Sequence, residues 1–219
     1  MSVDTNQLEL YDRSVTKING VFMSNLGRPV NYAAREAKIE GILDGAVQCF
    51  VKKGFHGAGM AEISRVAKVS QASLYQYFAS KNELILEIAK RYFSRDLEAL
   101  RRIESASDFM DALEREAYLT GDKTGTIMYL EILAESSRNS EIKEIVNESG
   151  RELFDTCCAM IKKLQSRDKV SYLFTPEQVT HYLFAYIDGL SCQIATADIE
   201  YSRVQLRQLV QTLLTPKNN

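Results

Sequence analysis

One short segment, residues 69–84, constrains the fold of this chain more than any other part of it. Two apolar residues in the segment, Leu74 and Phe78, stand four positions apart, which is the spacing of neighbours on one face of an α-helix. An earlier helix, which ends before residue 68, has an apolar face of its own, and the helical spacing of apolar residues is interrupted at residues 68–70. That upstream face consists of Ile63, Val66 and Ala67. Two short helices joined by a three-residue turn predict a helix-turn-helix.

The second of these helices, residues 71–78, leaves a polar side exposed when its apolar residues turn inward. The residues on that side are Gln71, Ala72, Tyr75 and Gln76. A DNA major groove can receive such a helix, and glutamine pairs well with adenine there. The sequence therefore predicts DNA binding through residues 71–78. The alternative for each side chain is simple exposure, because single exposed apolar residues are normal on protein surfaces.

A capping box at Ser80-Lys81-Asn82-Glu83 predicts the start of a long helix. Apolar residues continue that helix to about Arg102, a length of roughly 33 Å at about 1.5 Å per residue. An earlier amphipathic helix is expected from about Arg35 to Lys53, ended by Gly54 and followed by a loop at residues 55–59.

The whole chain is predicted to be all-α, because it has only three prolines, no tryptophan and few β-branched runs in its 219 residues. The expected organisation is a flexible tail (1–33), a helix-turn-helix domain (34–80) and a C-terminal helical domain (81–219). Further helices are expected near residues 107–119, 123–137 and 140–165.

The last two helices predict a homodimer. Thr175-Pro176-Glu177-Gln178 has the form of a helix start, and the helix after it is apolar around much of its circumference. The final segment, residues 204–214, repeats this character. One packed side cannot bury so much apolar surface, so we expect these two helices to form a four-helix interface with their copies.

Charge and composition narrow the function further. The net charge is −2, but residues 28–81 hold eight Lys or Arg against four acids. A basic module on an acidic body suits DNA binding at one end. No apolar run is long enough for a membrane helix, so a cytoplasmic location is expected. Four cysteines without CxxC spacing and two histidines indicate no metal site, and no cofactor is predicted.

The chain resembles the TetR-type one-component transcriptional repressors, most closely between Gly27 and Leu84. The residues that carry the resemblance are Gly27-Arg28-Pro29, Gly54-Phe55, Ile63, Val69, Leu74-Tyr75-Gln76-Tyr77-Phe78, Ser80-Lys81 and Leu84. Looser similarity continues at residues 131–135, 138–139 and 188–190. The resemblance implies a dimer on the double-stranded DNA of a palindromic operator, with a small effector in the C-terminal domain that changes the spacing of the DNA-binding domains.

Carried over by position, the resemblance implies DNA contacts from Gln71, Ala72, Tyr75 and Tyr77, and a phosphate contact from Lys81. Further candidates on or beside this helix are Lys68, Ser70, Ser73 and Gln76, although Ser70 also suits the helix cap.

The chain departs from the family pattern at three positions. Gly59-Met60 stands where a capping threonine is frequent, Lys68 replaces the usual turn glycine, and Tyr77 replaces a frequent histidine. Lysine in a glycine conformation should cost about 1 kcal/mol.

Soft and aromatic side chains of the later helices are enough to line an effector pocket, although most of them suit a plain core equally well. The candidates are Phe109, Tyr118, Met128, Tyr129, Glu131, Phe154, Cys158, Tyr182 and Tyr186. Asp188 is a further candidate as a polar anchor. Their character favours a hydrophobic or aromatic effector.

Two functions from different classes remain open at this point. The first is a ligand-responsive DNA-binding regulator, acting as a repressor. The second is an architectural or division-linked factor of the same fold that needs no effector. An enzyme is the least favoured class, because the sequence has no phosphate-binding glycine loop, HExxH motif or nucleophile elbow.

Overall fold

The computed structural model describes residues 32–105, 108, 109, 111, 123–167, 172–197 and 203–216. Within these ranges the chain forms α-helices and one isolated bridge between Tyr172 and Pro216, which confirms the all-α class. The helices are α1 (Tyr32–Gly57), α2 (Met60–Val66), α3 (Gln71–Tyr77), α4 (Lys81–Arg101), α6 (Thr124–Ser136), α7 (Ser140–Arg167), α8 (Pro176–Thr196) and α9 (Arg203–Leu213). The predicted tail and most of the helix expected near 107–119 lie outside the described residues.

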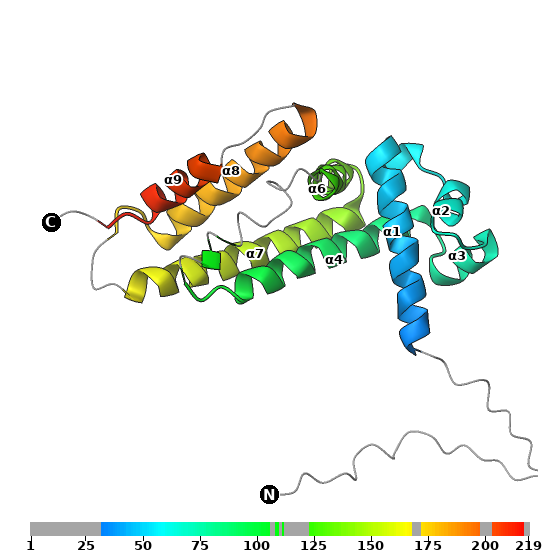
Figure 1. Ribbon diagram of the computed structural model, residues 1–219, viewed down its shortest axis with the longest axis horizontal. Helices are drawn as coiled ribbons and strands as arrows, with labels where there is room; N and C mark the ends of the chain where they lie inside the picture. The colour runs from blue at the N-terminus through cyan, green and yellow to red at the C-terminus, as the bar shows by residue number, and fades with distance from the viewer. Residues whose placement is uncertain are drawn as a thin grey trace, which may run out of the picture.

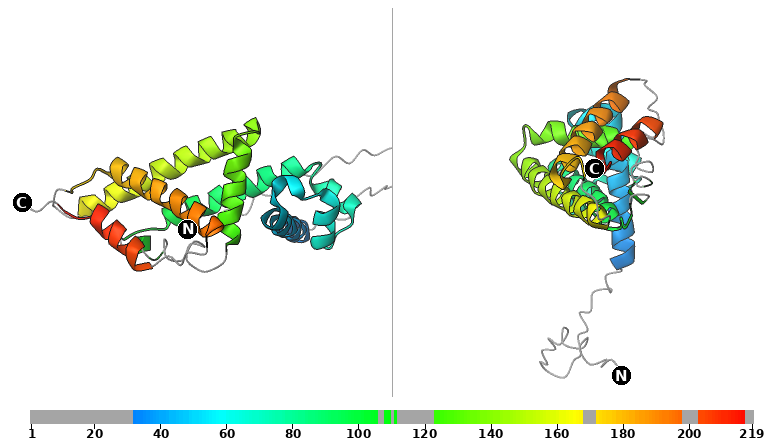
Figure 2. Two further views of the ribbon diagram at one scale, coloured as in Figure 1. Left: turned by 90° about the horizontal axis from the view of Figure 1, so that it is seen from above. Right: turned by 90° about the vertical axis from the view of Figure 1, so that its left-hand side faces the viewer.

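The molecule is elongated, with α2 and α3 at one end and α8 and α9 toward the other (Figures 1 and 2). Helices α4 and α7 run side by side along its length and pack against each other. Helix α6 packs against α1, α7 and α8. Because α4 begins directly after α3, the end that carries α3 is joined to the body by a continuous rigid element.

Local capping explains why α4 and α8 begin where the sequence predicts. The Ser80 hydroxyl accepts a hydrogen bond from the Glu83 backbone N–H at 3.1 Å. Thr175 and Gln178 form a complete capping box, with N–H to side-chain oxygen distances of 3.3 and 3.0 Å. Each cap satisfies backbone donors that the first turn of a helix otherwise leaves without a partner.

The first helix differs from the prediction at its C-terminal end. Gly54 has φ 71° and ψ 165°, so the helix breaks there as expected, but residues 55–57 resume helical hydrogen bonding instead of forming a loop. The Phe55 backbone N–H, which has lost its place in the helix, donates to the Glu131 carboxylate of α6 at 2.8 Å. A side chain 76 positions away therefore caps the new turn, which the local sequence could not reveal.

Two apolar cores hold the fold together. The first joins α1, α2 and α3 to the start of α4, to α6 and to the start of α7, and its fully buried members include Phe50, Leu74, Leu84, Ile132 and Ile142. The second lies among α7, α8 and α9, around Ile161, Val179, Leu183, Leu206 and Val210. The first core runs across the predicted domain boundary at residues 80–81, so α3 and α6 share one packed interior.

The apolar residues of α9 are buried within a single chain, whereas the sequence predicts that a partner copy is needed to bury them. Leu206, Val210 and Leu213 are at most 4% exposed within the single chain. The exposed face of α9 is polar and includes Gln205, Arg207, Gln208, Gln211 and Thr212. An amphipathic helix packs through a narrow apolar stripe on one side, and this stripe of α9 packs into the second core.

Candidate nucleic-acid interface and ligand cavity

Helix α3 presents a continuous exposed face at one end of the molecule. Gln71, Ala72 and Gln76 are exposed, and the Tyr75 side chain is 51% exposed. The opposite face is anchored by Leu74, which is fully buried in the first core. The helix is thus held rigidly while its outer face stays open to a partner.

The predicted contacts at the edges of α3 have structural roles. Ser70 is the N-cap, and its hydroxyl accepts from the Ser73 N–H at 3.1 Å. Tyr77 is half-buried against the first core, with the Arg35 guanidinium 5.8 Å from its ring centre. These contacts fix the ends of α3, so they set the angle at which its exposed face meets a partner.

The start of α2 has the weak cap that the sequence indicates. Gly59 is the N-cap and offers no side-chain hydrogen bond. Glu62, in the first turn, pairs with the Lys53 ammonium of α1 at 2.7 Å, and this hydrogen bond lowers the pKa of the Glu62 carboxyl. An ion pair to α1 therefore takes part in orienting a helix that a threonine does not cap.

The turn between α2 and α3 places a lysine in a left-handed conformation. Lys68 has φ 56°, and among the described non-glycine residues no other has a positive φ. The Val69 N–H donates to the Ser64 carbonyl at 2.9 Å, and the Lys68 N–H donates to the Arg65 carbonyl at 3.3 Å. This is the Schellman pattern, in which glycine is the usual residue at the left-handed position.

Replacing Lys68 with glycine is expected to stabilise the fold by about 0.5 to 1 kcal/mol, because glycine adopts this conformation without steric strain. The melting temperature should rise by about 1 to 4 °C. Lys68→Ala, which removes the charge but keeps the strain, is the matched control and should give no increase. An equal rise in both variants, measured by calorimetry, would assign the effect to charge and not to the backbone.

Lys81 is held by backbone carbonyls instead of projecting from the start of α4. Its ammonium donates to the carbonyls of Phe55, His56 and Ala58 at 2.7, 3.2 and 3.0 Å, and lies 4.7 Å from the centre of the Phe55 ring. Cations at a helix C-terminus satisfy the last carbonyls and the helix dipole. In this arrangement Lys81 fixes the end of α1 and the turn that follows it, residues 55–58, to the start of α4.

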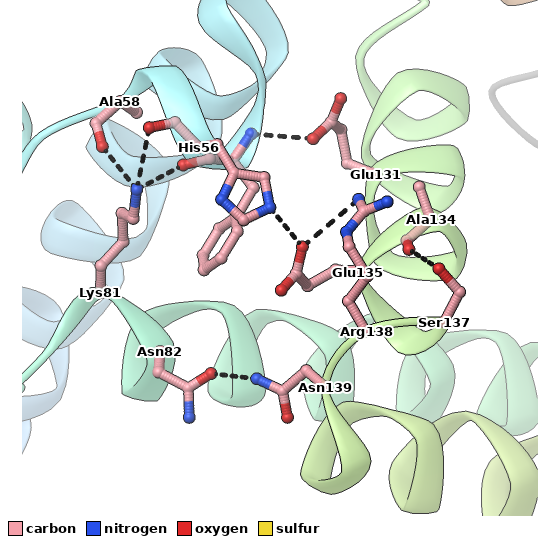
Figure 3. Close-up of polar contacts among 11 residues, drawn as sticks. His56, Ala58, Lys81, Asn82, Glu131, Ala134, Glu135, Ser137, Arg138 and Asn139 are labelled. Carbon is pink, nitrogen blue, oxygen red and sulfur yellow. Dashed lines mark hydrogen bonds and ion pairs between the residues drawn. The ribbon is translucent and has the colours of Figure 1, made fainter.

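Side chains of helix α6 contact the same end of α1 from the other side (Figure 3). The Glu135 side chain, only 7% exposed, accepts from His56 Nε2 at 2.8 Å and lies 3.5 Å from the Arg138 guanidinium. Together with the Glu131 contact to the Phe55 N–H, two carboxylates on one face of α6 hold residues 55 and 56. Two hydrogen bonds therefore join α6 to the end of α1.

A side-chain pair joins α4 to the start of α7 beside this junction (Figure 3). The Asn139 amide donates to Asn82 Oδ1 at 2.6 Å, and Asn82 donates to Glu141 at 2.8 Å. The Asn139 side-chain oxygen also accepts from the Glu141 and Ile142 N–H groups. The first turns of α4 and α7 are thereby fixed to each other.

A cavity of about 260 Å³ lies between α4, α6, α7 and α8. Its lining is mostly apolar and aromatic, as is usual for small-molecule sites. The described residues that line it are Phe93, Asp96, Ala99, Leu100, Ile103, Phe109, Tyr129, Leu133, Val146, Gly150, Leu153, Phe154, Cys157, Leu183, Phe184, Ile187 and Asp188.

The structure brings three of the predicted effector residues together in this cavity, namely Phe109, Tyr129 and Phe154, and places Asp188 there as well. Tyr118 lies outside the described residues. The other five predicted residues lie elsewhere: Met128 is buried in the first core, Glu131 caps Phe55, Cys158 donates to Thr180, Tyr182 is exposed beside Phe174, and Tyr186 packs against the second core.

Sequence reasoning missed the contribution of α4 to the cavity. Phe93, Asp96 and Leu100 follow one another at helical spacing along α4, a helix for which the sequence predicts no part in a ligand site. The signal that could have found them is an acidic residue within an apolar stripe, since a carboxylate rarely lies on a buried face without a reason.

One cysteine, Cys157, lines the cavity, and its thiol is a weak nucleophile. Cys157 is buried, and this burial raises the pKa of its thiol to about 11. It is therefore protonated at neutral pH, and the thiol is a much weaker nucleophile than the thiolate. The four cysteines are all free.

Comparison with known proteins agrees with both halves of the chain. The model described as "Bacterial regulatory proteins, tetR family" matches residues 42–88, and that of the "BetI-type transcriptional repressor, C-terminal" matches residues 115–215. The Escherichia coli regulator UidR is 26% identical over 80% of this chain and 91% of its own length. The Serratia proteamaculans regulator BetI is 25% identical over 80% of this chain and 89% of its own length.

Solved structures share the fold. Salmonella enterica GusR superposes with a TM-score of 0.67 at 24% identity, over 86% of this chain and 98% of that one. A transcriptional regulator from Saccharomonospora viridis in complex with choline gives a TM-score of 0.66 at 24% identity, over 81% and 94%. With a capped and exposed α3 at one end, a cavity in the body and family matches to both halves, the chain belongs to the TetR family of transcriptional regulators.

Proposed function

We propose that this protein is a cytoplasmic, ligand-responsive repressor that binds a palindromic operator as a homodimer and is released by a small effector. The observation that carries the proposal is the position of α6. Tyr129 and Leu133 on one face of this helix line the cavity, while Glu131 and Glu135 on the opposite face hold the end of α1. One rigid element thus contacts both the ligand site and the DNA-binding end.

On the DNA side, α3 enters the major groove with Gln71, Ala72, Tyr75 and Gln76 toward the base edges. The flanking residues position the helix on the phosphates, as most protein–DNA hydrogen bonds do. In this proposal they are Lys68, Ser70, Ser73 and Tyr77, whereas Lys81, whose three N–H groups already bond to carbonyls, acts by holding the end of α1. Lys68 is exposed in the turn before α3, where its ammonium can reach a phosphate.

The proposed dimer interface is centred on α8. Its exposed side carries Tyr182, Ala185, Gly189 and Cys192 at helical spacing, and these side chains are small or apolar apart from the tyrosine hydroxyl. Small residues allow the backbones of two helices to approach closely. The polar outer face of α9 would form the rim of the four-helix contact, because interface rims are polar.

Effector binding is proposed to shift a population between two positions of α6. A ligand acts only through different affinities for the two states, and allosteric coupling is typically about 1 to 3 kcal/mol. Solved relatives are described in complex with choline and with stearoyl-CoA, which supports a small-molecule effector here. The cavity also favours this function over a factor of the same fold that needs no effector.

The proposal is tested by mobility-shift titration of DNA from upstream of the protein's own gene, with unrelated DNA as competitor. We expect sequence-specific binding that weakens steeply with salt. A compound found by thermal-shift screening should then release the DNA. Specific binding that no stabilising compound alters would support the effector-independent function instead.

Filling the cavity should remove the response while DNA binding remains. Gly150 of α7 lines the cavity, and a Cβ placed on it would meet no other heavy atom within 4 Å. Gly150→Leu is expected to occupy the cavity, so that the effector affinity falls at least tenfold and operator affinity stays within a factor of about three. Gly150→Ala adds one methyl group and should retain most of the response. If the leucine variant still releases DNA normally, the effector binds elsewhere.

A further inference from the structure

The charged side chains that line the cavity are acidic. Among the described residues that line it, Asp96 of α4 and Asp188 of α8 are acidic, and none is lysine, arginine or histidine. The lining also includes aromatic rings from α4, α6, α7 and α8: Phe93, Tyr129, Phe154 and Phe184. Carboxylates beside aromatic faces form a surface that attracts cations.

Asp188 lines the cavity and is itself exposed. Its carboxylate accepts a hydrogen bond from the Tyr129 hydroxyl at 2.7 Å, which joins α8 to α6. Phe184 lies one turn earlier on α8 and packs edge to face with Phe154, their ring centres 5.8 Å apart. One carboxylate and two rings are therefore fixed in the same part of the lining.

Asp96 brings a second negative charge from α4. Its side chain is 23% exposed, and the Arg95 guanidinium lies 3.7 Å away. Arg95 is itself 63% exposed and stacks on Tyr92, 5.3 Å from the ring centre, and neither Arg95 nor Tyr92 lines the cavity. At 3.7 Å the Arg95 guanidinium is too far for a hydrogen bond, and ion pairs of exposed side chains are weak, so the Asp96 carboxylate still contributes negative charge to the lining.

Resting on the proposed function, we infer that the effector is an organic cation with an apolar body, such as an alkyl or arylalkyl ammonium. A carboxylate ligand would face two like charges, whereas an ammonium group gains from the carboxylates and from cation–π contact with the rings. The volume of about 260 Å³ is at the low end for ligand sites and selects a compact molecule.

Three probes of similar shape test this inference on the full chain: 4-phenylbutylamine, 4-phenylbutanol and 4-phenylbutanoate. They share an arylalkyl body and differ in the charge of the head group. Calorimetric titration should show the amine binding at least about tenfold more tightly than the alcohol, and the carboxylate binding more weakly than either. Preference for the alcohol or the carboxylate, or no binding of the amine up to millimolar concentration, would overturn the inference.

Asp188→Asn tests the residue that would carry the preference. The ratio of amine to alcohol affinity should fall by about fivefold to tenfold, while alcohol affinity remains within about twofold. The matched control is Asp155→Asn, because Asp155 is exposed on the same helix as Gly150 and does not line the cavity. An unchanged ratio in Asp188→Asn, with Asp96→Asn also unchanged, would contradict the inferred role of both carboxylates.

The outcome separates this inference from the proposed function. Operator binding by the wild-type chain, and its release by some compound of a mixed panel, depend only on the proposed function. If such release occurs with neutral or anionic compounds alone, the protein is still a ligand-responsive regulator and the cation preference is wrong.

Discussion

Replacing Tyr75 with alanine is expected to weaken operator binding by a factor of about 30 or more, without lowering the melting temperature. Tyr75 lies at the centre of the exposed face of α3 and is 51% exposed, so little folded structure depends on it. A contact at a base pair contributes about 1 to 3 kcal/mol. A symmetric dimer makes each contact twice, which gives about 2 to 6 kcal/mol, and 1.4 kcal/mol corresponds to a factor of ten.

The control for this measurement is Leu173→Ala. Leu173 is 54% exposed, close to the value for Tyr75, but it lies in the segment before α8, toward the opposite end of the molecule from α3 (Figure 1). Fluorescence anisotropy with labelled operator should show normal affinity for this variant. Normal affinity in Tyr75→Ala as well would mean that α3 is not the helix that contacts the DNA.

Alanine at Gly45 is expected to destabilise the protein by about 1 to 3 kcal/mol, the usual effect of overpacking a core. A Cβ on Gly45 would lie 2.8 Å from the Ala67 Cβ and 2.9 Å from the Ala67 backbone nitrogen. Helices α1 and α2 touch at this point through backbone atoms, which cannot move aside as a flexible side chain can. The melting temperature should fall by about 2 to 12 °C, and α3 should be displaced with α2.

Gly41, one turn earlier on α1, provides a matched control. A Cβ there would meet nothing within 4 Å, and the residue is exposed. Gly41→Ala should therefore stabilise the helix by about 0.5 to 1 kcal/mol, because alanine loses less backbone freedom on folding than glycine. Opposite signs for the two substitutions in thermal unfolding would support the close contact between α1 and α2. Equal effects would contradict it.

Sequence reasoning succeeded where the signal was local. The starts of α4 and α8 were predicted because Ser80 and Thr175 bond to groups three residues away. The position of α3 was predicted because its buried residue, Leu74, and its N-cap, Ser70, lie within a few residues of each other. The unusual backbone at Lys68, with φ 56°, was expected only from the family resemblance, in which glycine is usual at this position.

Predictions failed, or stayed incomplete, where distant segments decide the structure. Residues 55–57 are helical because Glu131 of α6 supplies an acceptor, and the Lys81 ammonium turns toward α1 because three carbonyls converge there. Composition identified aromatic side chains suited to a cavity. Composition could not distinguish Phe154, which lines the cavity, from Tyr182, which is exposed. That difference depends on how α7 and α8 are rotated against each other.

Hydroxyl-radical footprinting of the upstream DNA can establish whether two copies of α3 read a palindromic site. We expect two protected half-sites in successive major grooves, with centres about 34 Å apart along one side of the duplex. Protection should disappear with Tyr75→Ala at equal protein concentration. A single protected half-site, or uniform protection without sequence preference, would mean that no pair of α3 helices reads a palindrome.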